Sequence, residues 1–569
     1  MQGLTRIWKE PAGNSTENTL VSRILTARGI ISAEEHRSFL DPKLSTLEDP
    51  RELPDAEKAG AILCEYLRAG KKVLIYGDYD ADGITASSVL YHVIATATKK
   101  PGPPIYIPDR MSEGYGINPE AIEQFAKDGI DLVISVDCGV TAVEAAEKAK
   151  ELGLTLIVTD HHRPRDDGKL PDCAALVHPG IDEEPKTLFA GVGVAYQLAW
   201  AFARTWSGSQ QVTKELSQCL LDMLPFVAIG TIADMVPLEN GNRILARWGL
   251  QLLPSTTNAG LLAIMKQLDT PKMKLNSSHI SFGIAPLLNA VGRLAHATKA
   301  VDLLTHLDGP LAESSAKALA DLNRKRQKVQ RDIIENAIEQ IEKDKLYDNK
   351  IIVLQNDDWN RGVVGVAAGK CIETHYRPTI LLSGDGDELV GSARSIEGFS
   401  IFDALSSCED LLLKFGGHDM AAGLSVAREK YDAFVSAITK YANENIKPEQ
   451  LIKTVKPDVL ATQKEIKYAT AVEIEKMGPF GIGNPSPIVQ FSKVRVDSVS
   501  TMGNRGAHMS LQIGTSNERI RCIWWNNGGY APKLIRGMEI DVVAKIKVNE
   551  FRGRRTAELD LLDIALPSG

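Results

Sequence analysis

Residues 73–83 read Val73-Leu74-Ile75-Tyr76-Gly77-Asp78-Tyr79-Asp80-Ala81-Asp82-Gly83, an apolar run followed by three closely spaced carboxylates. A short apolar run bounded by turn residues is typical of a buried parallel strand. The same pattern recurs three times, with apolar runs at 132–136, 154–159 and 226–229 before Asp137, Asp160-His161-His162 and Asp234. In open α/β sheets, ligands bind beyond the carboxyl ends of the strands. We therefore expect these side chains to converge in one crevice.

So many carboxylates cannot share a crevice unless a cation compensates their charge. Oxygen ligands combined with imidazole suit Mn²⁺ or Mg²⁺. The alternative for Asp82-Gly83 alone is an ordinary Asp-Gly turn. Because Asp137, His161 and Asp234 occur in comparable positions, the pattern favours a two-metal phosphodiesterase site.

The composition is that of an ordinary globular protein, and 569 residues suggest roughly three or four domains. No stretch is long and apolar enough to predict a membrane span, and the first 18 residues show no signal-peptide pattern. The seven cysteines are scattered without a Cys-x-x-Cys pair. We therefore expect a cytoplasmic protein without a zinc site or a disulfide framework.

The net charge of −8 does not favour a nucleic-acid partner, but its distribution is uneven. From Lys456 to the C-terminus there are 16 basic and 12 acidic residues. A mildly basic C-terminal segment on an acidic chain is compatible with nucleic-acid binding. Trp524-Trp525 in this segment could stack on bases, although one of the two should face the core because side chains alternate along a strand.

Four segments follow from the patterns along the chain. Alternating strand and helix patterns predict a doubly wound parallel sheet within residues 1–310, after a polar N-terminal extension. Residues 311–345 contain neither Gly nor Pro and predict a long connecting helix. A second α/β unit is expected over 346–447, and short alternating runs over 448–569 predict a small barrel or sandwich.

Several motifs recur in a characteristic order along the chain. They are Asp80-Ala81-Asp82, Pro108-Asp109-Arg110, Gly114-Tyr115-Gly116, Asp160-His161-His162, Ala233-Asp234-Met235-Val236-Pro237-Leu238, Asn289-Ala290-Val291-Gly292-Arg293-Leu294, Gly391-Ser392-Ala393-Arg394-Ser395, Phe415-Gly416-Gly417-His418, Ala421-Ala422-Gly423 and Gly481-Ile482-Gly483-Asn484-Pro485. This set resembles the DHH phosphoesterase superfamily and, within it, the RecJ family of bacterial single-stranded-DNA-specific exonucleases.

The resemblance implies a DHH domain over 1–310, the connecting helix, a DHHA1 domain over 346–447 and an OB-like β-barrel over 448–569 that binds DNA. It also implies a metal-dependent 5′→3′ exonuclease that degrades single-stranded DNA to 5′-mononucleotides in DNA repair and recombination. Two Mn²⁺ or Mg²⁺ ions would be the cofactors. The expected partners are single-stranded DNA with a 5′ end, a single-stranded-DNA-binding protein and a helicase, with no membrane and with a monomeric enzyme.

The site residues implied by the resemblance fall into three groups. The metal ligands would be Asp80, Asp82, His161, Asp234 and a bridging Asp137. His162 would meet the scissile phosphate or act as an acid, Asp160 would orient His161, and Asp78 would act indirectly. The substrate phosphates would be bound by Arg110, Arg293, Ser392 and Arg394.

The chain departs from the family pattern at Tyr76, at His178-Pro179 and at Trp359-Asn360-Arg361-Gly362. Relatives often carry a His at the first of these positions, so a metal contact from Tyr76 is not expected. Two other functions stay open. The chain could be a DHH phosphoesterase for short oligonucleotides or cyclic dinucleotides, or a non-catalytic scaffold that binds single-stranded DNA.

Overall fold

The computed structural model describes residues 1–12, 18–110, 113–181, 184–208, 211–268, 275–384, 386–514 and 519–567. The chain forms two compact units. Unit 2 comprises Arg37–Asn323 and Lys476–Ser486, and unit 1 comprises Met1–His36, Arg324–Glu475 and Pro487–Gly569.

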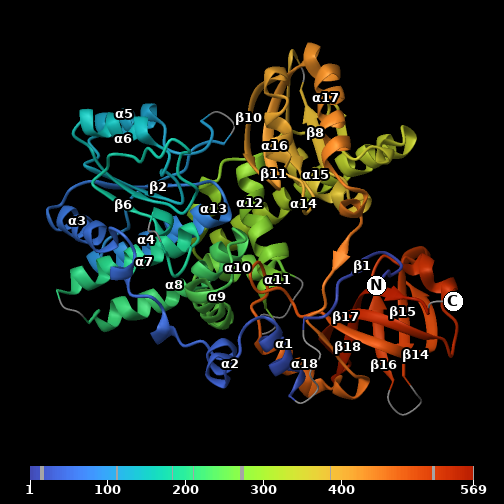
Figure 1. The fold of residues 1–569 in the computed structure, drawn as a ribbon. Coiled ribbons are helices and arrows are strands. Elements are labelled where there is room, and N and C mark those ends of the chain that lie inside the picture. Colours follow the sequence, from blue (N-terminus) through green and yellow to red (C-terminus); the bar gives the residue numbers. More distant parts are fainter. Residues whose placement is uncertain are drawn as a thin grey trace. The chain divides into compact units, whose positions relative to one another are not determined.

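Unit 2 is built on a five-stranded parallel sheet with the order β3-β2-β4-β5-β6 (Figure 1). The strands are β2 (Val73–Gly77), β3 (Ile105–Tyr106), β4 (Leu132–Val136), β5 (Thr155–Thr159) and β6 (Ala175–Val177). Every residue of β2 and β4 is buried, as expected for strands that are covered on both faces. The predicted doubly wound parallel sheet is confirmed.

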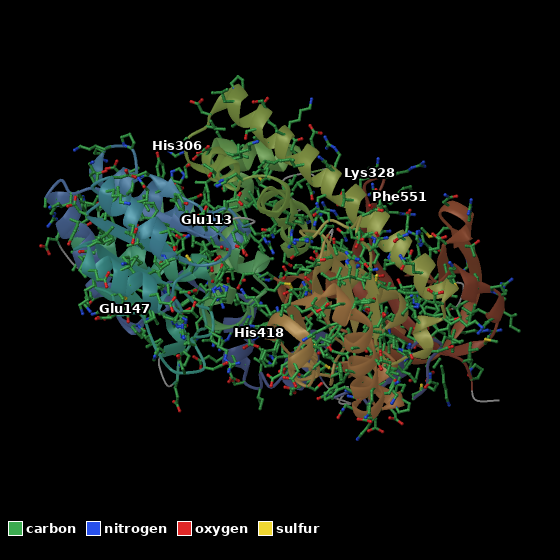
Figure 2. All side chains as sticks on the ribbon, turned by 90° about the horizontal axis from the view of Figure 1, so that it is seen from above. Glu113, Glu147, His306, Lys328, His418 and Phe551 are labelled. Carbon is green, nitrogen blue, oxygen red and sulfur yellow. The ribbon has the colours of Figure 1, made fainter. Side chains whose placement is uncertain are left out.

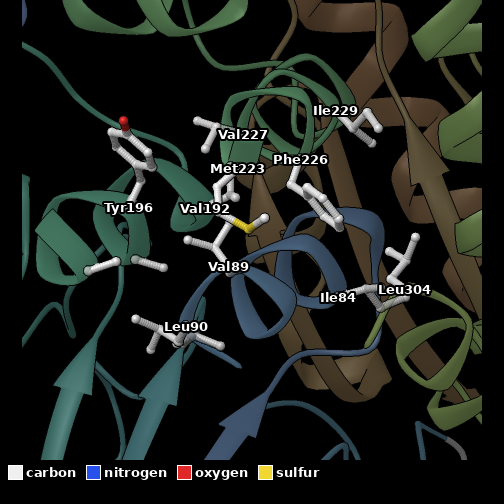
Figure 3. Packing of buried hydrophobic residues seen from close by; sticks show 14 of the residues in the cluster. Ile84, Val89, Leu90, Val192, Tyr196, Met223, Phe226, Val227, Ile229 and Leu304 are labelled. Atoms are coloured by element: carbon white, nitrogen blue, oxygen red, sulfur yellow. The ribbon is translucent and has the colours of Figure 1, made fainter. Parts of the chain in front are cut away.

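Helices cover both faces of this sheet. On one face, Leu74 and Val133 belong to a core with α5 (Pro119–Lys127) and α6 (Val143–Glu151). On the other face, Ile75 and Ile134 belong to a larger core with α4 (Ala81–Thr98), α7 (Gly191–Ser207) and α8 (Lys214–Ala233). Figure 3 shows this core, with side chains of α4, α7 and α8 in mutual contact.

The expectation of a strand at residues 226–229 is wrong. These residues lie inside α8, a 20-residue helix whose buried positions include Phe226 and Ile229. A helix that is buried on most sides presents a continuous apolar run, which periodicity alone cannot distinguish from a buried strand. The expectation that no stretch is long and apolar enough to span a membrane is also wrong for α8, which meets that test by length and composition. However, 72% of its apolar window is buried inside the protein, as in a core helix.

Unit 2 contains further helices before and after the sheet strands in the sequence. They are α3 (Ala56–Arg68), α9 (Asn240–Leu252), α10 (Ala259–Lys266), α11 (Ser277–His279), a π-helical turn (Ile280–Ile284), α12 (Ala285–Leu294) and α13 (Thr298–Thr305). The helix α14 (Gly309–Lys343) has 35 residues and occupies the position of the predicted connecting segment. Its residues up to Asn323 belong to unit 2 and the remainder to unit 1.

Unit 1 contains a five-stranded mixed sheet with the order β10-β11-β9-β8-β7. The strands are β7 (Ile352–Gln355), β8 (Thr379–Ser383), β9 (Glu388–Arg394), β10 (Leu412–His418) and β11 (Ala421–Ala427). Its helices are α15 (Val364–His375), α16 (Ile401–Ser406) and α17 (Tyr431–Asn445). The second predicted α/β fold is thus present.

The C-terminal part of unit 1 is a closed barrel, drawn in red in Figure 1. The strand order is β13-β14-β15-β16-β18-β17, and an additional β14–β17 pairing closes the ring. The strands are β13 (Val459–Leu460), β14 (Val489–Met502), β15 (His508–Ile513), β16 (Ile520–Trp524), β17 (Glu539–Phe551) and β18 (Arg554–Ala565). This ring confirms the expected OB-like barrel.

The N-terminal residues pack against the C-terminal part of unit 1. β1 (Ile7–Trp8) pairs in parallel with β12 (Thr454–Val455). From the helix α1 (Leu20–Ala27), Arg23 donates a hydrogen bond of 2.7 Å to the Leu460 carbonyl and forms an ion pair with Glu465. The predicted domain boundaries, which assign these N-terminal residues to the first domain, stay predictions.

Candidate metal centre and phosphate-binding residues

The metal-ligand candidates converge at the carboxyl ends of the parallel strands of unit 2. Asp78 follows β2, Asp137 follows β4, and the triplet that contains His161 follows β5. Asp234 arrives from a different kind of element, because it is the C-cap residue of α8. The helix and the three strands therefore end at the same crevice, as the order of the motifs predicts.

His161 lies among three carboxylates. Its Nε2 atom is 3.2 Å from Asp137 Oδ1, 3.6 Å from Asp234 Oδ2 and 3.9 Å from Asp82 Oδ2. The side chains form three groups whose possible ligand atoms all lie within 4.8 Å of one another, namely Asp82 with His161 and Asp234, Asp78 with Asp80 and Asp137, and Asp137 with His161 and His162. Asp137 thus adjoins both carboxylate groups.

Asp82 is fixed by the start of α7. Its Oδ2 accepts a hydrogen bond of 2.7 Å from the Gly191 N–H, and its Oδ1 accepts one of 2.9 Å from the Val192 N–H. The N-terminus of a helix stabilises a carboxylate in this position. Gly191 is needed for space, since a Cβ atom there would lie 2.3 Å from Asp137 Oδ1.

Asp80 caps the helix that carries Asp82. Its Oδ1 accepts hydrogen bonds from the Asp82 N–H (2.8 Å) and the Gly83 N–H (3.1 Å). The preceding N–H group, that of Ala81, donates 2.7 Å to Oδ1 of Asn289 on α12. These bonds satisfy the first N–H groups of α4 and fix the carboxylate loop in one conformation.

The carboxylates of this cluster lie close to one another, and those of Asp78, Asp82 and Asp137 are buried. Burial and the neighbouring carboxylates raise the pKa values of Asp82 and Asp137 well above their usual range. Burial, followed by the proximity of Asp80, raises the pKa of Asp78 to about 7. Burial also raises the pKa of Asp234.

Three buried atoms of the cluster have no hydrogen-bond partner among the described residues. They are Asp78 Oδ1, Asp137 Oδ1 and His161 Nε2. Buried polar atoms are normally satisfied, so acceptors of this kind beside carboxylates with raised pKa values fit a site for a cation. The donor set of oxygen atoms and one or two imidazoles fits divalent Mn²⁺ or Mg²⁺.

Asp160 orients His162. Its Oδ1 lies 2.8 Å from His162 Nδ1 and accepts hydrogen bonds from the N–H groups of both histidines, and its Oδ2 accepts 2.9 Å from the Val140 N–H. Although burial raises the pKa of Asp160, these hydrogen bonds, above all that from His162, lower it to about 2. The sequence led us to expect orientation of His161, whereas among the described residues the ring contact of Asp160 is to His162.

Tyr115 is a neighbour of His162 that the sequence did not single out. Its Oη lies 2.9 Å from His162 Nδ1 and 3.3 Å from the Asp137 carbonyl oxygen. Because an ionised Asp160 can only accept, Nδ1 carries the hydrogen and the Tyr115 hydroxyl donates to the carbonyl. Nε2 is then the His162 nitrogen that faces away from these contacts.

Arg110 and Arg293 lie near the carboxylate loop in unit 2. The Arg110 guanidinium stands 5.0 Å from the centre of the Tyr79 ring. Burial and Asp78 raise the pKa of Tyr79 to about 12, while Arg110 and Arg293 act in the opposite direction. The two arginines therefore bring positive charge to one side chain at the edge of the metal-ligand cluster.

Ser392 and Arg394 lie in unit 1, on the same face of β9. They face the first turn of α15, where a Cβ atom at Gly365 would lie 2.9 Å from Ser392 Oγ and 3.1 Å from Arg394 Nη2. Burial lowers the pKa of Arg394, which donates 2.8 Å to the Ala393 carbonyl. A hydroxyl, a guanidinium and a helix N-terminus, here called the anion cradle, are groups of the kind that bind anions.

Two departures from the family pattern have ordinary contacts. The Tyr76 side chain is buried in the core with α5, and its hydroxyl donates 2.9 Å to the Gly116 carbonyl. His178 Nε2 lies 2.7 Å from the His162 carbonyl oxygen and so contacts the backbone of the histidine pair.

The barrel exposes aromatic side chains next to basic ones. Trp524 is 2% exposed and belongs to the core, whereas Trp525 is 47% exposed and packs edge-on against His508 at 4.9 Å. Phe551, labelled in Figure 2, is 65% exposed, and the Arg552 guanidinium lies 5.2 Å from its ring centre. The alternation expected for the tryptophan pair is present.

Three family models match the chain in the order expected from the motifs. The DHH family N-terminal domain matches residues 72–229, the DHHA1 domain matches 348–444, and the RecJ OB domain matches 457–563. Together these models cover the parallel sheet, the mixed sheet and the closed barrel.

Similar proteins include the single-stranded-DNA-specific exonuclease RecJ of Bacillus subtilis, 37% identical over 96% of this chain and 68% of the relative. The protein of the same name from Escherichia coli is 31% identical over 95% of this chain and 94% of its own length. The crystal structure of Thermus thermophilus RecJ in complex with Mn²⁺ superposes with a TM-score of 0.82 at 28% identity, over 99% of this chain and 80% of that one. A structure of the same protein with Mg²⁺ gives a TM-score of 0.75 at 26% identity, over 99% and 79%. Identity above 30% over nearly the whole chain, with all three domains in order, places this protein in the RecJ exonuclease family.

Proposed function

We propose that this protein hydrolyses single-stranded DNA from its 5′ end and releases 5′-mononucleotides. The observation that carries the proposal is the pair of carboxylate groups that meet at Asp137, with three buried ligand atoms that have no hydrogen-bond partner among the described residues. Relatives at 30% identity or more are named single-stranded-DNA-specific exonucleases, and structures of the family contain Mn²⁺ or Mg²⁺.

Two sets of residues would hold the metal ions. Asp82, His161 and Asp234 would hold one ion, Asp78 and Asp80 the other, and Asp137 would contact both. Asp78 joins the ligands because its Oδ1 is buried without a partner among the described residues. Bound divalent ions activate water and offset the charge that develops on the scissile phosphate.

His162 is held so that one nitrogen can serve the substrate. Asp160 and Tyr115 engage Nδ1, which leaves Nε2 to contact the scissile phosphate or to donate a proton to the leaving oxygen. Asp160 holds the imidazole ring in this orientation through the 2.8 Å contact between its Oδ1 and His162 Nδ1. Asp160 therefore acts through His162 rather than on the substrate.

The 5′ end would be recognised by the anion cradle. Ser392, Arg394 and the start of α15 would bind a terminal phosphate, and Arg110 with Arg293 would bind phosphates beside the metal centre. Guanidinium groups bind phosphate through paired charge-assisted hydrogen bonds. Chemical recognition of the terminal phosphate accounts for 5′→3′ polarity.

The barrel would hold the strand outside the catalytic centre. Trp525 offers a face for base stacking, and the Phe551–Arg552 pair combines an exposed aromatic ring with a positive charge. Stacking is tolerant of sequence, as an exonuclease requires. A single-stranded-DNA-binding protein and a helicase would supply and present the strand to a monomeric, cytoplasmic enzyme that acts in DNA repair and recombination.

The test compares 5′-end-labelled single-stranded DNA, the corresponding duplex and a dinucleotide in the presence of Mn²⁺. Mononucleotide release from the single strand, suppressed by excess EDTA and absent on the duplex, is the expected result. Exclusive cleavage of the dinucleotide would instead support the oligonucleotide phosphodiesterase, and binding without cleavage would support the scaffold. Variants of the proposed metal ligands should lose cleavage. Asp128→Asn, which changes an exposed carboxylate at the end of α5, is the matched control and should cleave like the wild type.

A further inference from the structure

Residues 476–486, here called the return segment, leave unit 1 and pack within unit 2. The segment connects α18 (Tyr468–Lys476) with β14 of the barrel and contains the motif Gly481-Ile482-Gly483-Asn484-Pro485. In the sequence this motif belongs to the set that carries the family resemblance. Its contacts indicate a second role.

Two arginines of α9 bind the backbone of the return segment. Arg243 is 4% exposed, and its Nη2 donates to the carbonyls of Met477 (2.9 Å) and Gly478 (3.1 Å). Arg247 Nη1 donates to the carbonyls of Lys476 and Gly478, each at 2.8 Å. Because a buried guanidinium requires acceptors, the Met477 and Gly478 carbonyls that Arg243 contacts are part of the interior of unit 2.

The return segment is also fixed internally. Asn484 is 3% exposed, and its Nδ2 donates 2.8 Å to the carbonyls of both Met477 and Pro479. The Gly481 N–H donates 3.0 Å to the Asn484 carbonyl. A side chain that binds two carbonyls of its own loop holds that loop in one shape.

The tip of the segment lies against the chain that follows Asp234. The Leu238 N–H donates 2.8 Å to the Ile482 carbonyl, and a Cβ atom at Gly481 would lie 2.8 Å from Leu238 Cδ1. Gly483 has φ +73°, and a Cβ atom there would lie 2.9 Å from Glu239 Oε1 and 3.1 Å from Pro237 Cβ. The segment therefore contacts residues 237–239 directly.

Asp234 lies just before the residues that the return segment contacts. It is the last residue held by α8, and the next residue, Met235, has the unfavourable φ of 67°. A strained turn persists only where its surroundings fix it. The return segment provides fixed surroundings of this kind, because it contacts residues 237–239, which begin three residues after Asp234.

We infer that the return segment is a positioning element of the metal centre, which holds Asp234 opposite His161 by fixing residues 237–239. The inference rests on the proposed metal-dependent function. It implies that the return segment cannot be removed without loss of metal affinity in unit 2.

The test uses full-length Gly483→Ala with Gly553→Ala as the control. Both glycines have a left-handed conformation, with φ of +73° and +76°, but only Gly483 has neighbours within 4 Å of a new Cβ atom. Calorimetric titration with Mn²⁺ should show about tenfold weaker binding of one ion in Gly483→Ala, as is typical when a group that supports a ligand is lost. Gly553→Ala should titrate like the wild type.

A double-mutant cycle separates positioning from a general loss of structure. If the segment acts through Asp234, Gly483→Ala should cost no further Mn²⁺ affinity in an Asp234→Asn background, yet still cost about tenfold in an Asp78→Asn background. Asn484→Ala replaces Gly483→Ala if the latter does not fold. An unchanged titration of the folded variant, or an equal loss in both backgrounds, would overturn the inference. If the wild-type protein binds Mn²⁺ but degrades no DNA, the proposed nuclease function is refuted. The mutant cycle would still decide whether the return segment positions Asp234.

Discussion

The raised pKa of Asp78 predicts that the metal-free protein loses stability as the pH rises. A carboxyl group with a higher pKa in the folded than in the unfolded state binds more protons when folded. Its contribution to stability is therefore present below the unfolded value and is lost as the pH rises through the folded value. For Asp78 this window runs from 3.8 to about 7.

The size of the effect follows from the same two values. The pKa of Asp78 rises from 3.8 to about 7 on folding. At about 1.4 kcal/mol per tenfold change in proton affinity, this shift corresponds to about 4 kcal/mol of folding stability. About 2–3 kcal/mol of this stability should be lost between pH 5 and pH 8, because part of it is already lost below pH 5. Asp78→Asn removes the charge while it nearly preserves the shape.

The assay is urea unfolding of the wild type and Asp78→Asn in EDTA at pH 5 and pH 8. The free energy of unfolding of the variant, relative to the wild type, should increase by about 2–3 kcal/mol between the two pH values. Asp128→Asn should show no such increase. Saturating Mn²⁺ at pH 8 should stabilise the wild type more than Asp78→Asn, because metal binding needs the ionised ligand. Parallel pH profiles of wild type and Asp78→Asn would refute the reasoning.

Three further outcomes are expected. Asp137→Ala should abolish cleavage in Mn²⁺ but leave single-stranded-DNA affinity within about twofold, because binding depends on phosphate contacts elsewhere; full activity would contradict its place between the two ligand groups. Arg394→Ala should cost about 1.5–3 kcal/mol in kcat/KM on 5′-phosphorylated DNA and less on 5′-hydroxyl DNA, and equal losses on both ends would mean that Arg394 is only structural. Trp525→Ala should weaken single-stranded-DNA binding by about 1–3 kcal/mol without a change in Tm. Trp524→Ala should instead destabilise the fold by about 3–5 kcal/mol. A Trp525→Ala protein that is less stable but binds DNA normally would exclude the stacking surface.

The fold class could be predicted because buried parallel strands carry a strong local pattern. The runs before Asp78, Asp137 and Asp160 are strands β2, β4 and β5, and each ends where the sequence places it. The run before Asp234 was misassigned, since a helix buried on most sides and a buried strand both present continuous apolar residues. The carboxylate nevertheless reaches the same crevice, because the helix ends there.

Supporting residues of the site were harder to predict than its ligands. Tyr115 and Asn289 lie within quoted motifs, but nothing in their spacing shows that one contacts His162 and the other the Ala81 N–H. Gly483 is a turn residue by sequence, and its close approach to Glu239 becomes visible only in three dimensions. Such contacts join residues that are far apart in the chain, so local patterns carry no trace of them.

The amino-acid sequence by itself determined the order of the domains' folds, the strand ends from which the carboxylates project, and the chemical type of ion that such oxygen and imidazole groups can bind. These properties depend on residue type and on periodicity over a few residues. Only the tertiary structure decided that Asp160 meets the ring of His162, that Trp525 rather than Trp524 is exposed, and that residues 476–486 return to unit 2. The physical reason is that hydrogen bonds and close packing depend on distances of a few ångströms between segments brought together by folding.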